Sequence, residues 1–137
     1  MEKLSCILLV DDDKTTNFLN NLLLADLSVA HQVLVAENGQ QALCILREQG
    51  NTNNCPALIL LDINMPVMNG FEFLEAYQEL DFVNKQTVVI MMLTTSLNPR
   101  DVMRLQEMPL QGFLSKPLTR EKVQQLLKEH FPQKLAV

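Results

Sequence analysis

The sequence predicts a doubly wound α/β fold, in which helices cover both faces of a five-stranded parallel sheet to form a three-layer sandwich. Short, continuous apolar runs, typical of strands buried on both faces, alternate along the chain with segments of helical length. Most of these runs end abruptly at polar residues or at a Gly or Pro. Strands that alternate with helices imply right-handed crossovers and one parallel sheet.

Length and composition favour one soluble, cytoplasmic domain. With 137 residues, 47% hydrophobic and 20% charged, the chain is long enough to bury its own core. The formal net charge is −5 and the 11 Lys and Arg are scattered, so direct binding of nucleic acid is not expected. No apolar run approaches the roughly 18 residues of a membrane span, and no signal peptide is evident. Cys6, Cys44 and Cys55 lack C-x-x-C spacing, which favours reduced core residues.

The N-terminal part contains the first strand and the first helix. The strand covers residues 4–10 and ends at the acidic run Asp11–Asp13, of which Asp13 is placed to cap the following helix. That helix is expected from Lys14 to about Ala25. We expect its core face to carry Phe18, Leu19, Leu22 and Leu23, and its solvent face to carry most of Asn17, Asn20 and Asn21.

The middle of the chain repeats the alternation. A strand over residues 31–36 is followed by a helix whose inner face carries Ala42, Ile45 and Leu46. The strand Leu58–Leu61 then delivers one carboxylate, Asp62, to the point where the apolar pattern stops. After a loop that contains Pro66, a third helix is expected to about Leu80, because four residues repeat at i, i+3, i+4 and i+7: Gly70, Phe73, Leu74 and Tyr77.

The C-terminal third contains two more strand and helix pairs. A strand over residues 87–93 precedes Thr94, and a helix capped by Asn98 and Pro99 follows with only a thin apolar face. A short strand over residues 112–117 ends at a proline. The last helix is expected to be capped by Thr119 and to bury Val123, Leu126 and Leu127.

The carboxyl ends of parallel strands lie at one edge of the sheet, which brings polar residues from four strands together. Asp11, Asp12 and Asp62 supply carboxylates there, Thr94 a hydroxyl and Lys116 an ammonium group. Carboxylates packed this closely repel one another unless a cation compensates. Oxygen ligands favour Mg²⁺. Asp62 is then placed to attack a phosphoryl group whose charge is shared by the metal, Lys116 and Thr94, which gives an aspartyl phosphate.

These segments resemble the receiver domains of bacterial two-component response regulators, the CheY-like family, and the resemblance covers about residues 4–131. It implies a flavodoxin-like sheet of strand order 2-1-3-4-5 and a receiver domain over 4–131, followed by a flexible C-terminal tail over 132–137. The segments that carry the resemblance are Ile7–Asp13, Leu61–Gly70, Met92–Thr94 and Phe113–Pro117.

The resemblance also implies roles for the site residues. Asp62 is the phosphoacceptor, Asp12 binds Mg²⁺ directly, Asp11 acts largely through water, and the main-chain carbonyl of Asn64 completes the metal shell. Such a domain catalyses only its own phosphorylation and dephosphorylation and is not otherwise an enzyme.

The family further implies a switch. The Thr94 hydroxyl moves to the new phosphoryl group and Phe113 rotates inward, which remodels the surface of the fourth helix, fifth strand and fifth helix. Asn64 and Ser96 stand where the family tunes the lifetime of the phosphoryl group.

The implied partners are a sensor histidine kinase or a His-phosphotransfer protein, together with an unidentified downstream protein. The expected state is a monomer or a weak, phosphorylation-dependent dimer. A stand-alone regulator and a receiver taken from a longer protein, such as a hybrid kinase, fit the sequence equally.

Two other functions fit some of the same residues. Asp11-x-Asp13-x-Thr15 matches the signature of haloacid-dehalogenase-like phosphatases, with Asp11 as nucleophile and Asp13 as general acid. The acidic pair that such an enzyme needs after Lys116 is absent, and Asp62 is left without a role. The other alternative is a receiver-like adaptor that is never phosphorylated.

Overall fold

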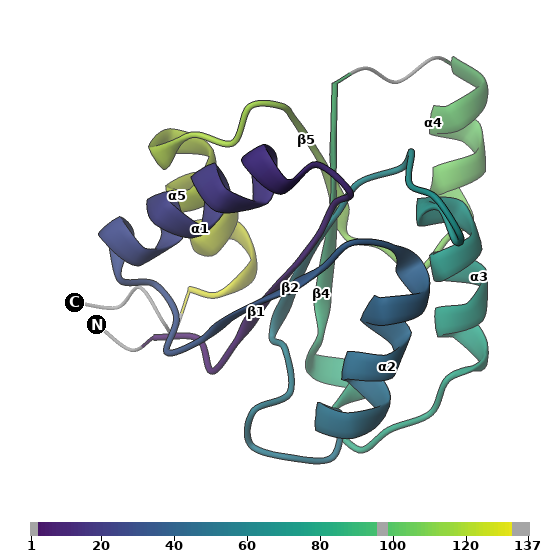
Figure 1. Cartoon of the computed structure of the whole chain (residues 1–137), viewed down its shortest axis with the longest axis horizontal. Coiled ribbons are helices and arrows are strands. Elements are labelled where there is room, and N and C mark those ends of the chain that lie inside the picture. Colours follow the sequence, from purple (N-terminus) through teal and green to yellow (C-terminus); the bar gives the residue numbers. More distant parts are fainter. Residues whose placement is uncertain (1–2, 96–98, 133–137) are drawn as a thin grey trace.

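A computed structural model of the chain describes residues 3–95 and 99–132, and it has the predicted three-layer architecture (Figure 1). The five strands form one parallel sheet of order β2-β1-β3-β4-β5. The strands are β1 (Ile7–Val10), β2 (Val33–Ala36), β3 (Leu58–Leu61), β4 (Val89–Thr94) and β5 (Gly112–Ser115). The helices are α1 (Lys14–Leu27), α2 (Gly39–Gln49), α3 (Gly70–Glu79), α4 (Pro99–Gln106) and α5 (Arg120–His130), with a short 3₁₀ turn at Lys85–Thr87.

The core is divided by the sheet into two apolar clusters. Alternate residues of β1 point to opposite faces, so Leu8 joins the cluster under α2, α3 and α4, whereas Leu9 joins the cluster under α1 and α5. All four residues of β1 and all four of β3 are therefore buried. This two-sided burial explains why the central strands are continuous apolar runs.

The predicted orientation of α1 is wrong for most of its residues, although Leu23 packs partly buried against the core and Asn21 is exposed, as expected. Phe18, Leu19 and Leu22 were expected in the core, but each side chain is more than half exposed. Asn17 and Asn20, expected on the solvent face, are both buried. The inward face of α1 is set by Leu24, which packs against the α5 side of the sheet. The run of three leucines at positions 22–24 gives the helix apolar residues on several sides, so periodicity alone did not determine its orientation.

The later helices agree better with the sequence. All four residues that mark the inner face of α3 are buried, as are Ala42 and Leu46 of α2. The Thr119 side chain caps α5 by accepting a hydrogen bond from the backbone N–H of Lys122 at 3.2 Å. The predicted cap Asn98 lies outside the described residues, and so do positions 133–137 of the predicted tail. On α4, Leu105 is buried and Val102 is partly exposed, which agrees with a thin apolar face.

Two of the three cysteines are core residues, as predicted, but the third is not. Cys6 and Cys55 are buried, whereas Cys44 lies on the exposed side of α2, and all three are free thiols. Burial raises the pKa of the Cys6 thiol to about 11, so this group stays protonated at neutral pH. Within the described part of the chain, no helix has the length and apolar character needed to cross a membrane.

Candidate functional site

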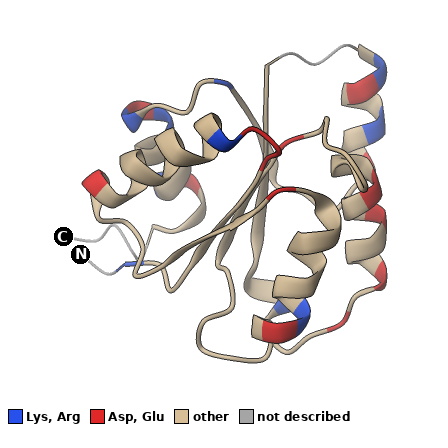
Figure 2. Ribbon diagram, in the orientation of Figure 1, with Lys and Arg blue, Asp and Glu red and all other residues tan. Residues whose placement is uncertain are grey.

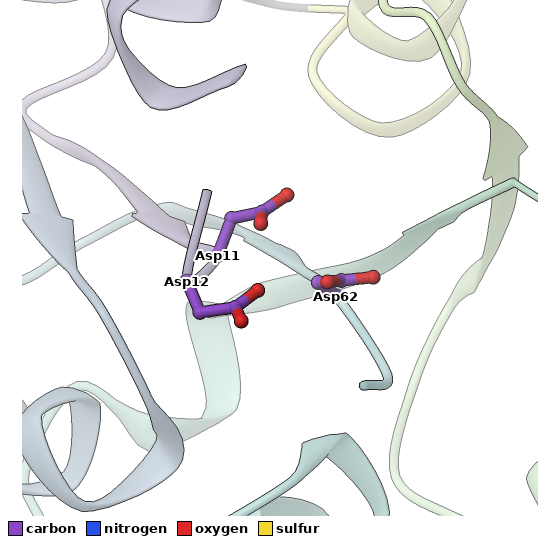
Figure 3. Close-up of side chains that lie close together, drawn as sticks. All are labelled: Asp11, Asp12 and Asp62. Carbon is purple, nitrogen blue, oxygen red and sulfur yellow. The ribbon is translucent and has the colours of Figure 1, made fainter. Parts of the chain in front are cut away.

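The carboxylates of Asp11, Asp12 and Asp62 lie together at the carboxyl edge of the sheet (Figure 3). β1 and β3 are neighbours in register, with Val10 opposite Leu61, so the residues that follow them emerge side by side. The N–H of Asp62 donates to the carbonyl of Val10 at 2.9 Å, which continues the ladder to the site. One carboxylate oxygen from each aspartate lies within 4.8 Å of the others.

In the turn after β1, the three consecutive aspartates differ in burial and in their hydrogen bonds. Asp11 is buried, and its carboxylate accepts a hydrogen bond from the N–H of Asp13 at 2.9 Å. Asp12 is exposed at the mouth of the cluster. Asp13 caps α1, because its carboxylate accepts from the backbone N–H of Thr15 at 3.0 Å and from the hydroxyl of Thr16 at 2.8 Å. Hydrogen bonds from Thr16 and then Thr15 lower the pKa of Asp13, which holds this carboxylate as a charged cap.

Lys116 supplies the cation that the sequence requires. It follows β5, and its ammonium group donates to Asp11 Oδ2 at 2.7 Å and lies 3.6 Å from Asp62 Oδ1. Burial by itself lowers the pKa of Lys116, but the hydrogen bond to Asp11 and the charges of Asp62 and Asp11 outweigh burial and raise it. Lys116 therefore remains charged and links β5 to the ends of β1 and β3.

The pKa of Asp62 is shifted upward, in the opposite direction to that of Asp13. Its side chain is largely buried, with 9% of the residue exposed. Burial and the neighbouring charge of Asp11 raise the pKa of Asp62, while Lys116 and a hydrogen bond from the Ile63 N–H at 2.9 Å oppose that rise. A cation bound beside Asp62 would relieve this repulsion.

The loop after Asp62 leads to Gly70, the first residue of α3, and its two ends lie close together. The N–H of Gly70 donates to the Ile63 carbonyl at 2.8 Å. A Cβ at Gly70 would lie 2.6 Å from the main-chain oxygen of Asp62, so only glycine fits there. Val67, by contrast, holds a left-handed backbone with a φ of 65° although its branched side chain disfavours it. The loop is thus fixed at Gly70 and strained at Val67.

The structure describes three of the four remaining predicted site residues. Thr94 is buried at the end of β4, and its carbonyl accepts from the N–H of Lys116 at 2.8 Å. Phe113, on the edge strand β5, is 40% exposed. Asn64 is exposed in the loop after Asp62, and Ser96 lies outside the described residues.

The donor set suits Mg²⁺. Three carboxylates and one ammonium group leave a formal charge of −2 in the cluster. The ligand atoms are hard oxygens on two adjacent strand ends, with Asp12 open to water, and Mg²⁺ binds through one or two carboxylates while keeping several waters. In Figure 2 acidic residues mark this central edge where β1 and β3 end.

Sequence reasoning missed the role of Asn17. Its side-chain amide donates to the main-chain carbonyl of Asp11 at 2.8 Å in a buried hydrogen bond. Asn17 therefore ties the first turn of α1 to the strand end that carries the site. The sequence signal for this role is that Asn17 lies one helical turn after the capping Asp13. It points to a buried position only once it is known which side of α1 faces the sheet.

Comparison with known proteins gives one consistent result. The family model of the response regulator receiver domain matches residues 7–128. The chain is 34% identical to response regulator Rcp1 of Synechocystis over 112 residues, which are 80% of this chain and 75% of that protein. Among solved structures, a two-component response regulator from Cytophaga hutchinsonii has a TM-score of 0.84 at 28% identity, over 96% of this chain and 99% of that one.

A similar segment also occurs inside a larger protein. The sensor histidine kinase AruS of Pseudomonas aeruginosa is 34% identical over 100 residues, which are 72% of this chain but only 9% of that protein. Domains of this type therefore occur both alone and joined to a kinase. The family is one of signalling modules rather than of classical enzymes, and its members partner with histidine kinases. With its five-stranded parallel sheet, its acidic edge and a match over residues 7–128, the chain belongs to the response regulator receiver domain family.

Proposed function

We propose that the chain, with residues 4–131 as its receiver domain, accepts a phosphoryl group on Asp62 from a phosphohistidine of a kinase or phosphotransfer protein. The observation that carries the proposal is the placement of the Asp62 carboxylate. It lies 3.6 Å from the Lys116 ammonium group and within reach of the carboxylates of Asp11 and Asp12. Family membership supports the same chemistry for this edge.

The transfer is an in-line displacement at phosphorus. A carboxylate oxygen of Asp62 forms the new O–P bond while the N–P bond of the phosphohistidine breaks, and the imidazole nitrogen keeps the electron pair. The reaction needs Asp62 deprotonated. Burial and the Asp11 charge raise the pKa of Asp62, and a cation bound beside it would oppose that rise and favour the deprotonated nucleophile.

Lys116 and Thr94 then act on the transferred group. Lys116 already lies beside Asp62 and would neutralise part of the phosphoryl charge. Thr94, at the end of the adjacent strand β4, would turn its hydroxyl toward the phosphoryl oxygens. Mg²⁺, held by Asp11, Asp12, Asp62 and the main-chain carbonyl of Asn64, would supply further charge neutralisation at this edge.

Movement of Thr94 is proposed to pass to the α4-β5-α5 surface through Phe113. Phe113 pairs in register with Met92 of β4, two residues before Thr94, and is part-exposed, so an inward turn of its ring would change the surface of β5. A local charge change then biases a two-state surface. Asn64 and Ser96 are proposed to set how long the phosphoryl group persists.

The proposed partners are a sensor histidine kinase or a His-phosphotransfer protein, with a downstream protein as the target of the switch. Phosphohistidine donors of this type and the free thiols of the chain agree with a cytoplasmic location. Direct contact with nucleic acid or a membrane is not part of the proposal, since the chain has a net charge of −5.

The experiment is intact-mass spectrometry after incubation with acetyl phosphate, with and without Mg²⁺, on the wild type and on Asp62→Asn. We expect one phosphoryl adduct that requires both the metal and Asp62. An adduct that survives in Asp62→Asn would contradict the assignment.

The same experiment separates the alternatives. Donor hydrolysis that continues in Asp62→Asn but stops in Asp11→Asn would identify a phosphatase that uses Asp11. The site geometry argues against it, because Asp13, its required general acid, is engaged as the cap of α1. No adduct under any condition would favour either an adaptor that is never phosphorylated or a site to which Thr95 restricts the access of phosphodonors.

A further inference from the structure

The turn between β5 and α5 is held by a lysine to which the proposed chemistry gives no role. Lys122, in the first turn of α5, directs its ammonium group back over the turn that precedes the helix. It donates to the main-chain carbonyl of Ser115 at 2.7 Å, to the Ser115 hydroxyl at 3.1 Å and to the carbonyl of Pro117 at 2.9 Å. An ammonium group has three N–H donors, so these contacts use all of them.

The two carbonyls lie on either side of Lys116 in the chain. Ser115 is the last residue of β5 and precedes Lys116, and Pro117 follows it. The N–H of Lys116 itself donates to the main-chain carbonyl of Thr94 at 2.8 Å. The backbone at Lys116 is therefore tied to β4 by its own N–H and to α5 through both of its neighbours.

A fixed backbone matters at Lys116 because its side chain is long. The ammonium group donates to Asp11 Oδ2 at 2.7 Å and lies 3.6 Å from Asp62 Oδ1. A lysine stem is flexible and adopts many rotamers, so the position of the backbone decides which of them reach the carboxylates. A shift of the turn would move the ammonium group away from Asp62 or force another rotamer on Lys116.

Stabilisation of α5 does not explain the position of Lys122. The amino end of a helix carries partial positive charge, which makes its first turn an unfavourable place for a cation. The N–H of Lys122 is already capped, because the Thr119 side chain accepts from it at 3.2 Å. The ammonium group therefore serves the turn rather than the helix. Ser115 and Pro117 are exposed, so water can replace Lys122 at their carbonyls with little loss of stability.

We propose that Lys122 is a positioning residue of the phosphoryl site, which holds the turn on both sides of Lys116 and thereby keeps the Lys116 ammonium group beside Asp62. The inference rests on the proposed phosphoacceptor function, in which Lys116 neutralises charge on the transferred phosphoryl group. Lys122 acts through Lys116 and not on the phosphoryl group itself. Small displacements of a group that stabilises a transition state lower the rate strongly, so loss of Lys122 should slow phosphorylation.

The first test is the rate of labelling by acetyl phosphate with Mg²⁺, followed by intact-mass spectrometry. Lys122→Met should lower the rate about fivefold. Lys122→Arg should stay within about twofold of the wild type, because a guanidinium group has enough N–H donors for the same carbonyls. Lys128→Met is the matched control, since it removes the same charge from an exposed position of α5 and should leave the rate unchanged.

The second test is a double-mutant cycle of Lys122→Met with Lys116→Met. Lys116→Met should keep slow labelling, because the nucleophile Asp62 remains. If Lys122 acts only through Lys116, the double variant should be labelled within about twofold of the rate of Lys116→Met alone. A residue that acts on the site independently of Lys116 would slow the Lys116→Met variant by the same factor as it slows the wild type.

The third test reports on the turn without any phosphodonor. Amide hydrogen exchange of Lys116, whose N–H is bonded to the Thr94 carbonyl, should become about tenfold faster in Lys122→Met, because the turn opens more often. The N–H of Val123, which donates to the Thr119 carbonyl within α5, is the internal control and should exchange at an unchanged rate. Urea unfolding reports whether each variant is folded.

The outcomes separate this proposal from the phosphoacceptor function on which it rests. A wild type that is never labelled would overturn the phosphoacceptor function, and amide exchange at Lys116 would then decide alone whether Lys122 holds the turn. With a labelled wild type, three results would overturn the positioning role. They are a wild-type rate in Lys122→Met, equal slowing of the wild type and of Lys116→Met, and unchanged exchange at Lys116. A folded Lys122→Arg as slow as Lys122→Met would also contradict it, because the hydrogen bonds would then not explain the effect.

Discussion

The acidic edge of the sheet and the outer face of α1 depart from the usual distribution of polar and apolar residues in opposite directions. At the edge, Asp11 and Asp62 are buried among strand ends. On α1, Phe18 and Leu22 are exposed to solvent. The two regions are adjacent in the chain, because Asp13, which ends the first acidic turn, is also the cap of α1.

The two regions differ in whether their unusual side chains make contacts within the chain. The buried carboxylates are held by contacts inside the chain, namely the Lys116 ammonium group and backbone N–H groups. The exposed side chains of α1 surround a hollow that nothing within the described part of the chain fills. We therefore expect substitutions at the edge to change the stability of the monomer and substitutions on the α1 face to leave it nearly unchanged.

The largest effect is expected from Lys116→Met, which removes the cation from the acidic edge. Asp11 and Asp62 would remain buried without the ammonium group that contacts both, so the free energy of unfolding should fall by about 3 kcal/mol. Urea unfolding followed by circular dichroism measures it.

The control for that substitution is Lys128→Met on the exposed side of α5, which should change the free energy of unfolding by no more than about 0.5 kcal/mol. Equal losses in the two variants would mean that Lys116 is no more than a surface charge.

A second, smaller effect separates the two faces of α1. Asn17→Ala removes the buried hydrogen bond to the Asp11 carbonyl and should cost about 2 kcal/mol, because that carbonyl loses its partner. Leu22→Ala on the opposite face should cost less than about 0.5 kcal/mol. Chemical denaturation measures both. A larger loss from Leu22→Ala would mean that the predicted, inverted orientation of α1 is correct after all.

Asp62→Asn should act in the opposite direction and stabilise the monomer by about 1 kcal/mol. Burial and the Asp11 charge raise the pKa of Asp62, so its ionised form opposes folding at neutral pH. As the pH falls through the raised pKa, the native chain binds a proton before the unfolded chain does, and stability contributed by this group rises until the pH reaches the ordinary value of 3.8. Unfolding curves of the wild type and of Asp62→Asn should be compared from pH 7 to pH 4. The free energy of unfolding of the wild type minus that of Asp62→Asn should rise as the pH falls.

The smallest effect is expected in the loop between β3 and α3. Val67 is exposed and holds a φ of 65°, which a branched residue adopts at a cost of about 1 kcal/mol. Val67→Asn should therefore raise the free energy of unfolding by about 0.5 to 1 kcal/mol, since asparagine tolerates the left-handed region. Thermal unfolding measures the change. A loss of stability would show that the Val67 side chain has a packing role that its exposure does not reveal.

The site was more predictable from the sequence than the surface was. The short apolar run Leu58–Leu61 indicated a strand buried on both faces, and strand direction then predicted Asp62 beside Asp11, as the structure has them. The orientation of α1 could not be obtained in the same way, because leucines at positions 22–24 fit several helix phases and the deciding contacts, from Leu24 to the core and from Asn17 to Asp11, are tertiary. The strained backbone of Val67 is likewise invisible in a sequence, since valine there gives no turn signal.

The most direct test of the account is to locate the phosphoryl group on the chain. Borohydride reduces an acyl phosphate to an alcohol, so a phosphorylated aspartate becomes homoserine, which tandem mass spectrometry of the digested chain assigns to one position. After labelling with acetyl phosphate and Mg²⁺, the account predicts homoserine at position 62 and none in the metal-free sample. Homoserine at position 11 or 12 would contradict it, because the nucleophile would then be a carboxylate of the β1 turn and not Asp62.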